Sequence, residues 1–403
     1  MEAMNIIFVN SSFPRSEAEP IISGEHKNAY YLAKTLSEQG HDITVLTHRA
    51  PEPRYSYGDM EVIEVGDGVG KGFVRAIHRS TNEVSPAREV LEEKDIDLIH
   101  SHALSTSGAL IFLRQRGYID APIISTAHGT NLPEIEANLT NIDLKDALYY
   151  VNAQVKRFID TYSWTRSDGV ISVSEFQLDE MRDIYGVSDE RLTAIPNGVD
   201  TEHYKPASGS EIKAEYDLED KKVVLFVGRL VRKKGIQVLV DAAPEIVAEH
   251  PDVAFLLVCG SEEFAHYGEE LIEKIRQSPV SDRFTVLQRV PEADLPDYYN
   301  AADLLVVPSL NYESIPTVIF EGMACELPVV GTNRWGIPYQ LGSEETLIPQ
   351  GDAGALKREV NELLGDPERR SQLGKQNRER AIAEFDWTKI AGDHEDFYTE
   401  VIQ

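Results

Sequence analysis

"KKVVLFVGRLVRKKG" occupies residues 221–235 and combines the signals that decide the fold class. An apolar, β-branched run ends at Gly228, and a stretch with helical periodicity follows Gly235. The run is apolar throughout instead of alternating with polar residues, which predicts a strand of a parallel sheet, buried on both faces. Basic residues stand between strand and helix: Arg229, Arg232, Lys233 and Lys234.

Short apolar runs alternate with longer amphipathic stretches along the whole chain. Strands are expected in NIIFV, DITVLT, EVIEV, DLIHS, PIISTAH, GVISVS and LTAIPN, and then in KKVVLFVG, VAFLLVCG, FTVLQRV, ADLLVVPS and LPVVGT. The segment 196–210, PNGVDTEHYKPASGS, is rich in turn-forming residues and has no apolar periodicity. We therefore expect two doubly wound α/β domains, residues 1–200 and 201–385, followed by a terminal helix at about 386–403.

The charge balance disfavours anionic partners. Asp and Glu number 68 against 39 Lys and Arg, which gives a formal net charge of −29. A field of this sign repels nucleic acid and anionic lipid at low salt. We hypothesise adaptation to molar intracellular salt, where such self-repulsion is screened. Full stability after dialysis into dilute buffer would contradict that hypothesis.

The sequence predicts a cytoplasmic protein with at most peripheral membrane contact. No apolar run approaches the length of a membrane span, and "MEAMNIIFVNSSFP" has no secretion leader. Cys259 and Cys325 form no CxxC pair and lie in apolar runs, so we expect buried free thiols. The first domain shows no obvious basic amphipathic patch.

The turn after the strand at 222–227 is a candidate diphosphate site. Gly228 permits a tight turn, while Arg229 and Lys234 offer a guanidinium fork and an ammonium group. The alternative is a solvated basic turn that balances neighbouring acids.

"NYESIPTVIFEG", residues 311–322, contains two glutamates seven residues apart, with a helix expected between them. Ser314 is a candidate cap, and Pro316 suits the first turn. Glu313 and Glu321 could both accept hydrogen bonds from sugar hydroxyls in a cleft. The alternative is a capped helix with partly exposed carboxylates.

The first half offers Gly24, just before a helix, and His128, at the end of a strand. Asp95 and Asp97 form a D-x-D, but they precede their strand, at the wrong end of the sheet for a ligand. The glycine-rich GDGVGKGF, residues 66–73, matches no phosphate-binding motif and is interpreted as a loop.

Taken in order, these motifs resemble the retaining GT-B-fold glycosyltransferases of family 4. The resemblance runs from the Gly24 loop through DLIHSH, TAHGT, IPNGVD and FVGRLVRKKG to the E-x7-E region. It implies two facing Rossmann-like domains with a cleft between them and a last helix that packs back on the first domain. The implied reaction moves a sugar from a nucleotide sugar to a lipid-linked, glycan or small-molecule acceptor, without cofactor or essential metal.

The resemblance also implies roles for individual residues. Arg229 and Lys234 would bind the donor diphosphate. Glu313 would meet the sugar hydroxyls, and Glu321 the ribose. The remaining positions would be Ile315, Pro316 and Thr317 at the distal phosphate, Val290 along the base, Gly24 at the phosphate from the first domain, and His128 near the reacting carbons.

Two departures from the family pattern leave alternatives open. Ser314 and Pro316 replace glycines beside the donor sugar, and Trp335 begins a loop that usually reads Gly-Gly-x-Pro-Glu. The alternatives are a GT-B nucleotide-sugar epimerase and a catalytically silent sugar-nucleotide scaffold. A phosphorylase would need pyridoxal phosphate, for which no lysine motif is recognised.

Overall fold

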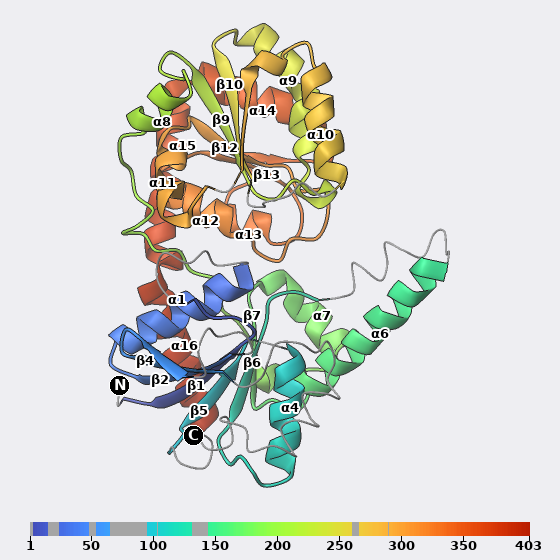
Figure 1. Cartoon of the computed structure of the whole chain (residues 1–403), viewed down its shortest axis with the longest axis vertical. Coiled ribbons are helices and arrows are strands. Elements are labelled where there is room, and N and C mark those ends of the chain that lie inside the picture. The colour runs from blue at the N-terminus through green and yellow to red at the C-terminus, as the bar shows by residue number, and fades with distance from the viewer. Residues whose placement is uncertain are drawn as a thin grey trace. The chain divides into compact units, whose positions relative to one another are not determined.

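The computed structural model describes residues 3–14, 24–47, 54–64, 95–102, 104–130, 144–259, 266–288 and 290–403. The chain divides into two compact units: unit 1 is Met1–Asn197 with Trp387–Gln403, and unit 2 is Gly198–Asp386. Each unit has one largely parallel sheet between helices (Figure 1). The predicted fold class, two doubly wound Rossmann-like domains, is therefore confirmed.

The sheet of unit 2 has six parallel strands in the spatial order β11-β10-β9-β12-β13-β14. In chain order they are β9 (Lys222–Val227), β10 (Val253–Cys259), β11 (Phe284–Gln288), β12 (Leu304–Val307), β13 (Val329–Thr332) and β14 (Leu347–Ile348). The direction of winding reverses between β9 and β12. Doubly wound sheets bind ligands at this switch point, outside the carboxyl ends of the strands.

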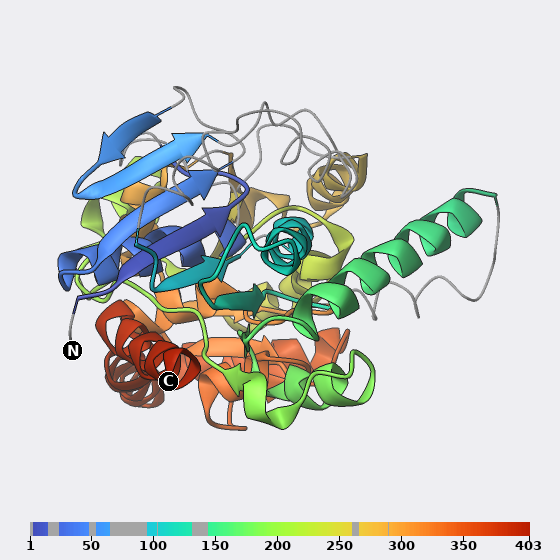
Figure 2. The ribbon, with the colours of Figure 1, turned by 90° about the horizontal axis from the view of Figure 1, so that it is seen from below.

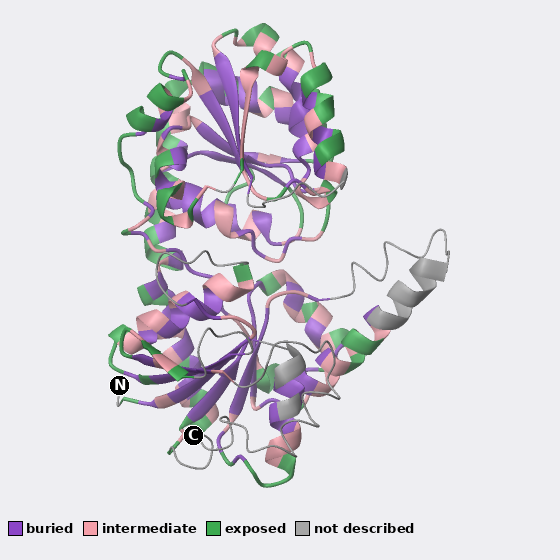
Figure 3. Cartoon of the chain, viewed as in Figure 1, coloured by how far each residue is buried: buried purple, intermediate pink, exposed green. Residues whose placement is uncertain are grey.

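Helices bury both faces of this sheet. One face packs against α8 (Ser210–Glu215), α11 (Leu295–Asn300), α12 (Thr317–Ala324), α13 (Ile337–Leu341) and the end of α15 (Pro367–Phe385). The other packs against α9 (Ile236–Glu249), α10 (His266–Gln277) and α14 (Ala353–Gly365). Successive residues of β9 alternate between the two cores, and the strands are buried along most of their length (Figure 3). Single 3-10 turns complete the unit: η3 (Arg232–Lys234), η4 (Ser281–Arg283) and η5 (Glu292–Asp294).

The sheet of unit 1 has the order β3-β4-β2-β1-β5-β6-β7-β8, and only the β3–β4 pair is antiparallel. The strands are β1 (Asn5–Asn10), β2 (Asp42–Thr47), β3 (Arg54–Tyr57), β4 (Met60–Glu64), β5 (Leu98–Ser101), β6 (Ile123–Ala127), β7 (Gly169–Ser172) and β8 (Leu192–Ala194). Its switch point lies between β1 and β5, so ligand contacts are expected beside the ends of these two strands.

The helices of unit 1 include one from the far end of the sequence. They are α1 (Gly24–Glu38), α4 (Leu104–Gln115), α6 (Leu144–Trp164), α7 (Leu178–Asp183), α16 (Trp387–Ile402) and the 3-10 turns η1 (Glu175–Gln177) and η2 (Asp189–Arg191). Helix α16 joins the core under α1, where Trp387 stacks on Tyr31 with ring centroids 5.8 Å apart. The chain thus returns to its first unit after completing the second.

Helix α6 projects from the body of unit 1 in both views (Figures 1 and 2). It exposes Val155 and Phe158, the latter at 70%, next to the exposed Lys156. This surface was not predicted from the sequence. None of the helices in the described part of the chain is long and apolar enough to span a membrane.

The structure can be compared with several of the local predictions. Asp97 accepts a hydrogen bond from the backbone N–H of Asn5 at 2.7 Å, which supports a structural role for the D-x-D at the start of β5. Cys259 and Cys325 are free and buried, as expected. Strands β3 and β14 were not predicted. The GDGVGKGF segment lies outside the described residues.

Candidate functional site

The candidate donor site of unit 2 lies where β9 and β12 end, at the switch point. These strands are parallel neighbours, with Val224 paired to Leu304 and Leu225 to Leu305. The β9–α9 loop and the β12–α12 loop therefore leave the sheet side by side. Backbone N–H groups of Leu310 and Asn311 bond to the carbonyl of Lys233 at 2.8 and 3.3 Å, which ties the two loops together.

Glycines shape the β9–α9 loop. Gly228 has φ 152° and Gly235 has φ 71°, conformations that other residues rarely adopt. A Cβ on Gly235 would lie 1.8 Å from the carbonyl oxygen of Pro308, so only glycine fits against the β12–α12 loop. Arg229 stands exposed in this loop, whereas the Arg232 guanidinium stacks over the Tyr267 ring at 5.0 Å.

Lys234 and Glu313 form an ion pair across the two loops. Nζ of Lys234 lies 2.8 Å from Oε1 of Glu313, and the side chains are only 19% and 9% exposed. The two groups are close enough for an ion pair, but the contact does not have hydrogen-bond geometry, so Oε1 has no hydrogen-bond donor. A buried carboxylate oxygen without a hydrogen-bond donor is costly, so the pair retains capacity to bind a polar ligand.

The start of α12 differs from the sequence prediction. The helix begins at Thr317 with Pro316 as its N-cap residue, and no side chain caps it. The assignment of Ser314 as a cap was therefore wrong, because the chain enters the helix two residues later and Pro316 occupies the cap position. Ile315 and Pro316 are buried and Thr317 is half-buried, and the first N–H groups of the helix have no side-chain partner there.

Glu321 lies one turn into α12 and is only 4% exposed. Its Oε2 accepts a hydrogen bond of 2.7 Å from the hydroxyl of Tyr299 on α11. Burial, and then the adjacent Glu321 charge, raise the pKa of Tyr299 well above its usual range. The tyrosine therefore stays protonated and orients the carboxylate. Val290, half-buried, packs against the same core.

The loop that contains Trp335 packs directly on the backbone beside Glu313. Gly336 donates its N–H to the carbonyl of Glu313 at 3.2 Å, and a Cβ on Gly336 would lie 1.7 Å from the carbonyl oxygen of Ser314. Trp335 has φ 56°, a strained conformation for a bulky residue, and Arg334 before it is exposed. This departure from the family pattern therefore borders the candidate donor site.

In unit 1, Gly24 is the exposed first residue of α1, and the half-buried His128 follows β6. Burial, and then the charge of His26, lower the pKa of His128 to about 3. Burial raises the pKa of Glu25, next to Gly24, to about 7. Glu25 was missed by the sequence analysis because nothing in its local pattern signals burial.

His100 and His102, at the end of β5, were also missed as candidate residues. His102 lies beside His128, with Nδ1 and Nε2 of the respective rings 3.2 Å apart. The rule that ligands meet strand ends would have pointed to the H-x-H of DLIHSH, because β5 borders the switch point. Among the described residues, no three His, Cys, Asp or Glu side chains are placed to hold a metal ion.

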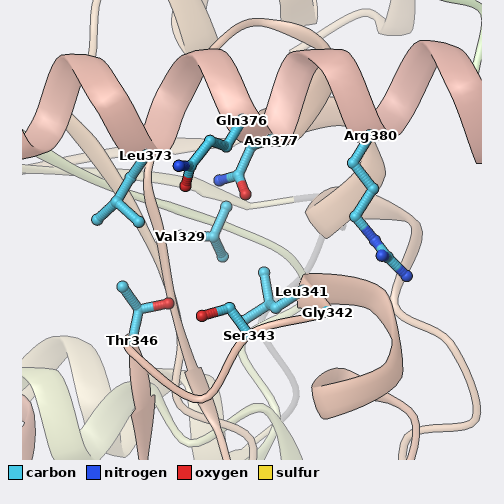
Figure 4. Close-up of a pocket in the computed structure, with 9 residues that line it drawn as sticks. All are labelled: Val329, Leu341, Gly342, Ser343, Thr346, Leu373, Gln376, Asn377 and Arg380. Atoms are coloured by element: carbon cyan, nitrogen blue, oxygen red, sulfur yellow. The ribbon is translucent and has the colours of Figure 1, made fainter.

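A pocket of about 180 Å³ lies elsewhere in unit 2, where β13 and β14 begin (Figure 4). Its lining residues are Val329, Leu341, Gly342, Ser343, Thr346, Leu373, Gln376, Asn377 and Arg380. The guanidinium of Arg380 bonds to the carbonyls of Tyr339 and Gln340. This pocket is at the amino edge of the sheet, the opposite edge from Glu313, so it is not part of the candidate site.

Comparison with known proteins agrees with this architecture. Residues 22–203 match the Glycosyltransferase Family 4 family, and residues 209–380 match Glycosyl transferases group 1. The chain is 31% identical over 263 residues to alpha-maltose-1-phosphate synthase of Mycolicibacterium smegmatis, covering 62% of this chain and 67% of that protein. For another relative, spore coat protein SA of Bacillus subtilis, the alignment covers 62% of its length.

Solved structures share the fold over nearly the whole chain. Sucrose-phosphate synthase of Thermosynechococcus elongatus superposes with a TM-score of 0.80 at 23% identity, covering 99% of both chains. HepE of Anabaena, in complex with UDP and glucose, superposes with a TM-score of 0.74 at 20% identity, covering 98% of this chain and 99% of that one. The fold and the family matches define a member of the glycosyltransferases with the GT-B fold. The chain belongs to glycosyltransferase family 4.

Proposed function

We propose that the protein transfers a sugar from a nucleotide sugar to an acceptor with retention of anomeric configuration and without an essential metal ion. The observation that carries this proposal is the buried Lys234–Glu313 pair at the β9–β12 switch point, with Arg229 exposed beside it. The pair offers a cation for a phosphate and a carboxylate oxygen with free capacity for a hydroxyl, within one ligand's reach.

Each further contact in unit 2 has a chemical reason. Arg229 and Lys234 neutralise the diphosphate, whose negative charge grows as the bond to the anomeric carbon breaks. The first N–H groups of α12, after Ile315 and Pro316, face the distal phosphate from Thr317 onward. Glu313 accepts from the sugar hydroxyls, Glu321 from the ribose, and Val290 lies along the base. In unit 1, Gly24 donates to the phosphate and His128 contacts the sugar.

The reaction needs no carboxylate nucleophile. As the leaving group departs, the anomeric carbon becomes oxocarbenium-like, and an acceptor hydroxyl attacks the face that the diphosphate leaves. A donor phosphate oxygen takes the hydroxyl proton, so the nucleoside diphosphate departs with that proton and configuration is retained. The acceptor is a lipid-linked, glycan or small molecule, and we propose that the protein acts in the cytoplasm, either free or at the inner face of the membrane.

This mechanism is tested by ¹H NMR of donor turnover in molar KCl. Without an acceptor, water can take the place of the attacking hydroxyl, so α-linked UDP-, GDP- and ADP-sugars are incubated with the protein, with and without EDTA. We expect the α-anomer of the free sugar first, at an unchanged rate in EDTA. The β-anomer first would contradict retention, and loss of activity in EDTA would contradict metal independence.

The same experiment separates the two alternatives. An epimerase would convert the donor to a changed nucleotide sugar without releasing nucleoside diphosphate. A silent scaffold would bind the donor and leave it intact with every acceptor offered. The strained Trp335 loop packs beside Glu313, the residue proposed to contact the donor sugar, so this loop could change which donor the protein accepts.

A further inference from the structure

The end of β5 and the end of β6 bring two histidine rings into contact. The strands are parallel neighbours, so His102 and His128 leave the sheet on the same edge. Nδ1 of His102 lies 3.2 Å from Nε2 of His128. His128 is half-buried, whereas His102 is only 1% exposed. His102 therefore lies behind His128 and is shielded from solvent.

The His102 ring is held in a fixed orientation. It stacks on Phe8 with centroids 5.6 Å apart and planes 13° from parallel, and the His100 ring lies 4.2 Å away. Its backbone N–H bonds to the carbonyl of Val9 at 2.9 Å. A ring packed on two sides by aromatic groups cannot turn to seek another partner, so the contact with His128 is the one it makes.

Only one of the two ring nitrogens of His102 has a hydrogen-bond partner. Nδ1 meets His128, but Nε2 is buried and has no hydrogen-bond partner. Burial lowers the pKa of His102 and of His128, so both rings are neutral at pH 7 and each carries one N–H. Two arrangements are then possible, and they differ in which group of His102 is left unpaired.

If His102 carried its proton on Nε2, a buried N–H donor would have no acceptor, which costs on the order of 1–3 kcal/mol. If the proton is on Nδ1, that N–H is donated to His128 and only an acceptor lone pair is left over. An unpaired acceptor is tolerated more often than an unpaired donor. The geometry thus favours the Nδ1–H tautomer of His102.

We propose that His102 is a positioning residue that fixes His128 in its own Nδ1–H tautomer. Because Nε2 of His128 accepts the bond from His102, the single proton of His128 is on Nδ1. His128 therefore presents a hydrogen-bond donor, not a general base, at its free nitrogen. Building on the proposed function, that donor serves an oxygen of the transferred sugar, so sugars with a hydroxyl at that position are preferred over deoxy analogues.

The tautomer is measurable in the full chain without any substrate. Uniform ¹⁵N-histidine labelling and long-range ¹H–¹⁵N correlation distinguish protonated from unprotonated ring nitrogens, and His128→Gln assigns the signals. We expect both His102 and His128 as neutral Nδ1–H tautomers at pH 7.5. An Nε2–H tautomer for His128 would overturn the proposal, and so would a charged ring.

Two substitutions of similar size test the causal step. In His102→Asn, the side-chain N–H₂ occupies the place of Nδ1 and still donates, so His128 should keep its tautomer and most of its activity. In His102→Leu, no donor is left, so His128 should become a tautomer mixture, with kcat/KM lowered about 10- to 100-fold. An unchanged tautomer in a folded His102→Leu protein would contradict the proposal.

If His102→Leu does not fold, the wild-type and His102→Asn spectra still decide the tautomer assignment. The readout is also independent of the proposed function. A protein with the expected tautomers but no sugar transfer would leave the positioning role intact and refute the transferase activity. A protein that transfers sugar but lacks the expected tautomers would refute the positioning role alone.

Discussion

Lys234→Ala and Arg229→Ala are each expected to lower the rate of sugar transfer by about 100- to 1,000-fold, the range typical for removing one group that stabilises transition-state charge. Both side chains leave the β9–α9 loop at the switch point. The diphosphate gains negative charge only as the sugar departs, so the loss should appear in kcat as well as in kcat/KM.

The two variants should differ in stability, and this difference separates catalysis from folding. Arg229 is exposed, so its removal is expected to leave the melting temperature almost unchanged. Removing Lys234 leaves Glu313 buried without its cation, at a cost of up to about 3 kcal/mol. The double variant Lys234→Met/Glu313→Gln removes both charges and should recover most of that stability but none of the activity.

Steady-state kinetics in molar KCl, with thermal melts of the same preparations, provide the measurement. Lys234→Arg is the matched control, because it keeps the positive charge and should retain more activity than Lys234→Ala. Near-normal turnover in Lys234→Ala and Arg229→Ala would contradict the assignment of both residues to the diphosphate.

The largest expected stability effect is acid destabilisation, between about pH 6.5 and pH 4. Four histidines of unit 1, the buried His100, His102 and His394 and the half-buried His128, have lowered pKa values: about 3 for His128, about 4 for His394, and well below the usual range for His100 and His102. Burial is the first cause in each, and the neighbouring histidines add to the lowering for His100 and His102.

The direction follows from where protons bind. In the unfolded chain these histidines titrate near pH 6.5, so between pH 6.5 and 4 the unfolded state binds more protons than the folded state. Stability is therefore complete above pH 6.5 and falls as pH decreases, by about 1.4 kcal/mol per pH unit for each fully shifted histidine. Glu25, with its raised pKa of about 7, acts in the opposite direction and offsets part of the loss.

Urea melts between pH 7.5 and 5.0 in molar KCl measure this slope. His394 is not one of the candidate site residues, and its Nδ1 forms a hydrogen bond with the carbonyl of Ile390. His394→Gln therefore removes one of the four histidines without changing a candidate site residue. In this variant, the unfolded state should bind about one proton fewer relative to the folded state, so the free energy of unfolding should change less steeply with pH. A stability that stays flat from pH 7.5 to 5.0 would contradict the neutral, buried state of these rings.

The sequence was informative wherever local pattern reflects burial. The twelve predicted strands, NIIFV to LPVVGT, are all present. Most of them are buried on both faces and therefore apolar, whereas β8 and β11 are only partly buried. Strand β3 was missed because it is a short antiparallel edge strand with alternating exposed residues and no apolar run. Strand β14 has only two residues, too few for any periodicity.

The candidate site could be predicted residue by residue but not as a set of contacts. The Lys234–Glu313 pair depends on β9 and β12 being neighbours, which chain order alone does not reveal because β10 and β11 intervene. The hydrogen bond from Tyr299 to Glu321 and the contact between His102 and His128 likewise arise only when helices and strands pack. Ser314 looked like a cap because its type suits one, but the position of Pro316 decides where α12 begins.

The central claim, a nucleotide-sugar site at the switch point of unit 2, is tested most directly by thermal shift in molar KCl. UDP-, GDP-, ADP- and dTDP-sugars are compared on wild type and on Glu321→Gln, in which the amide oxygen can still accept from Tyr299. Ligand at 100 times its Kd adds about 2.7 kcal/mol, a clear rise in melting temperature. The account predicts a shift with one nucleotide class that weakens in Glu321→Gln; no shift with any of them on folded protein would contradict it.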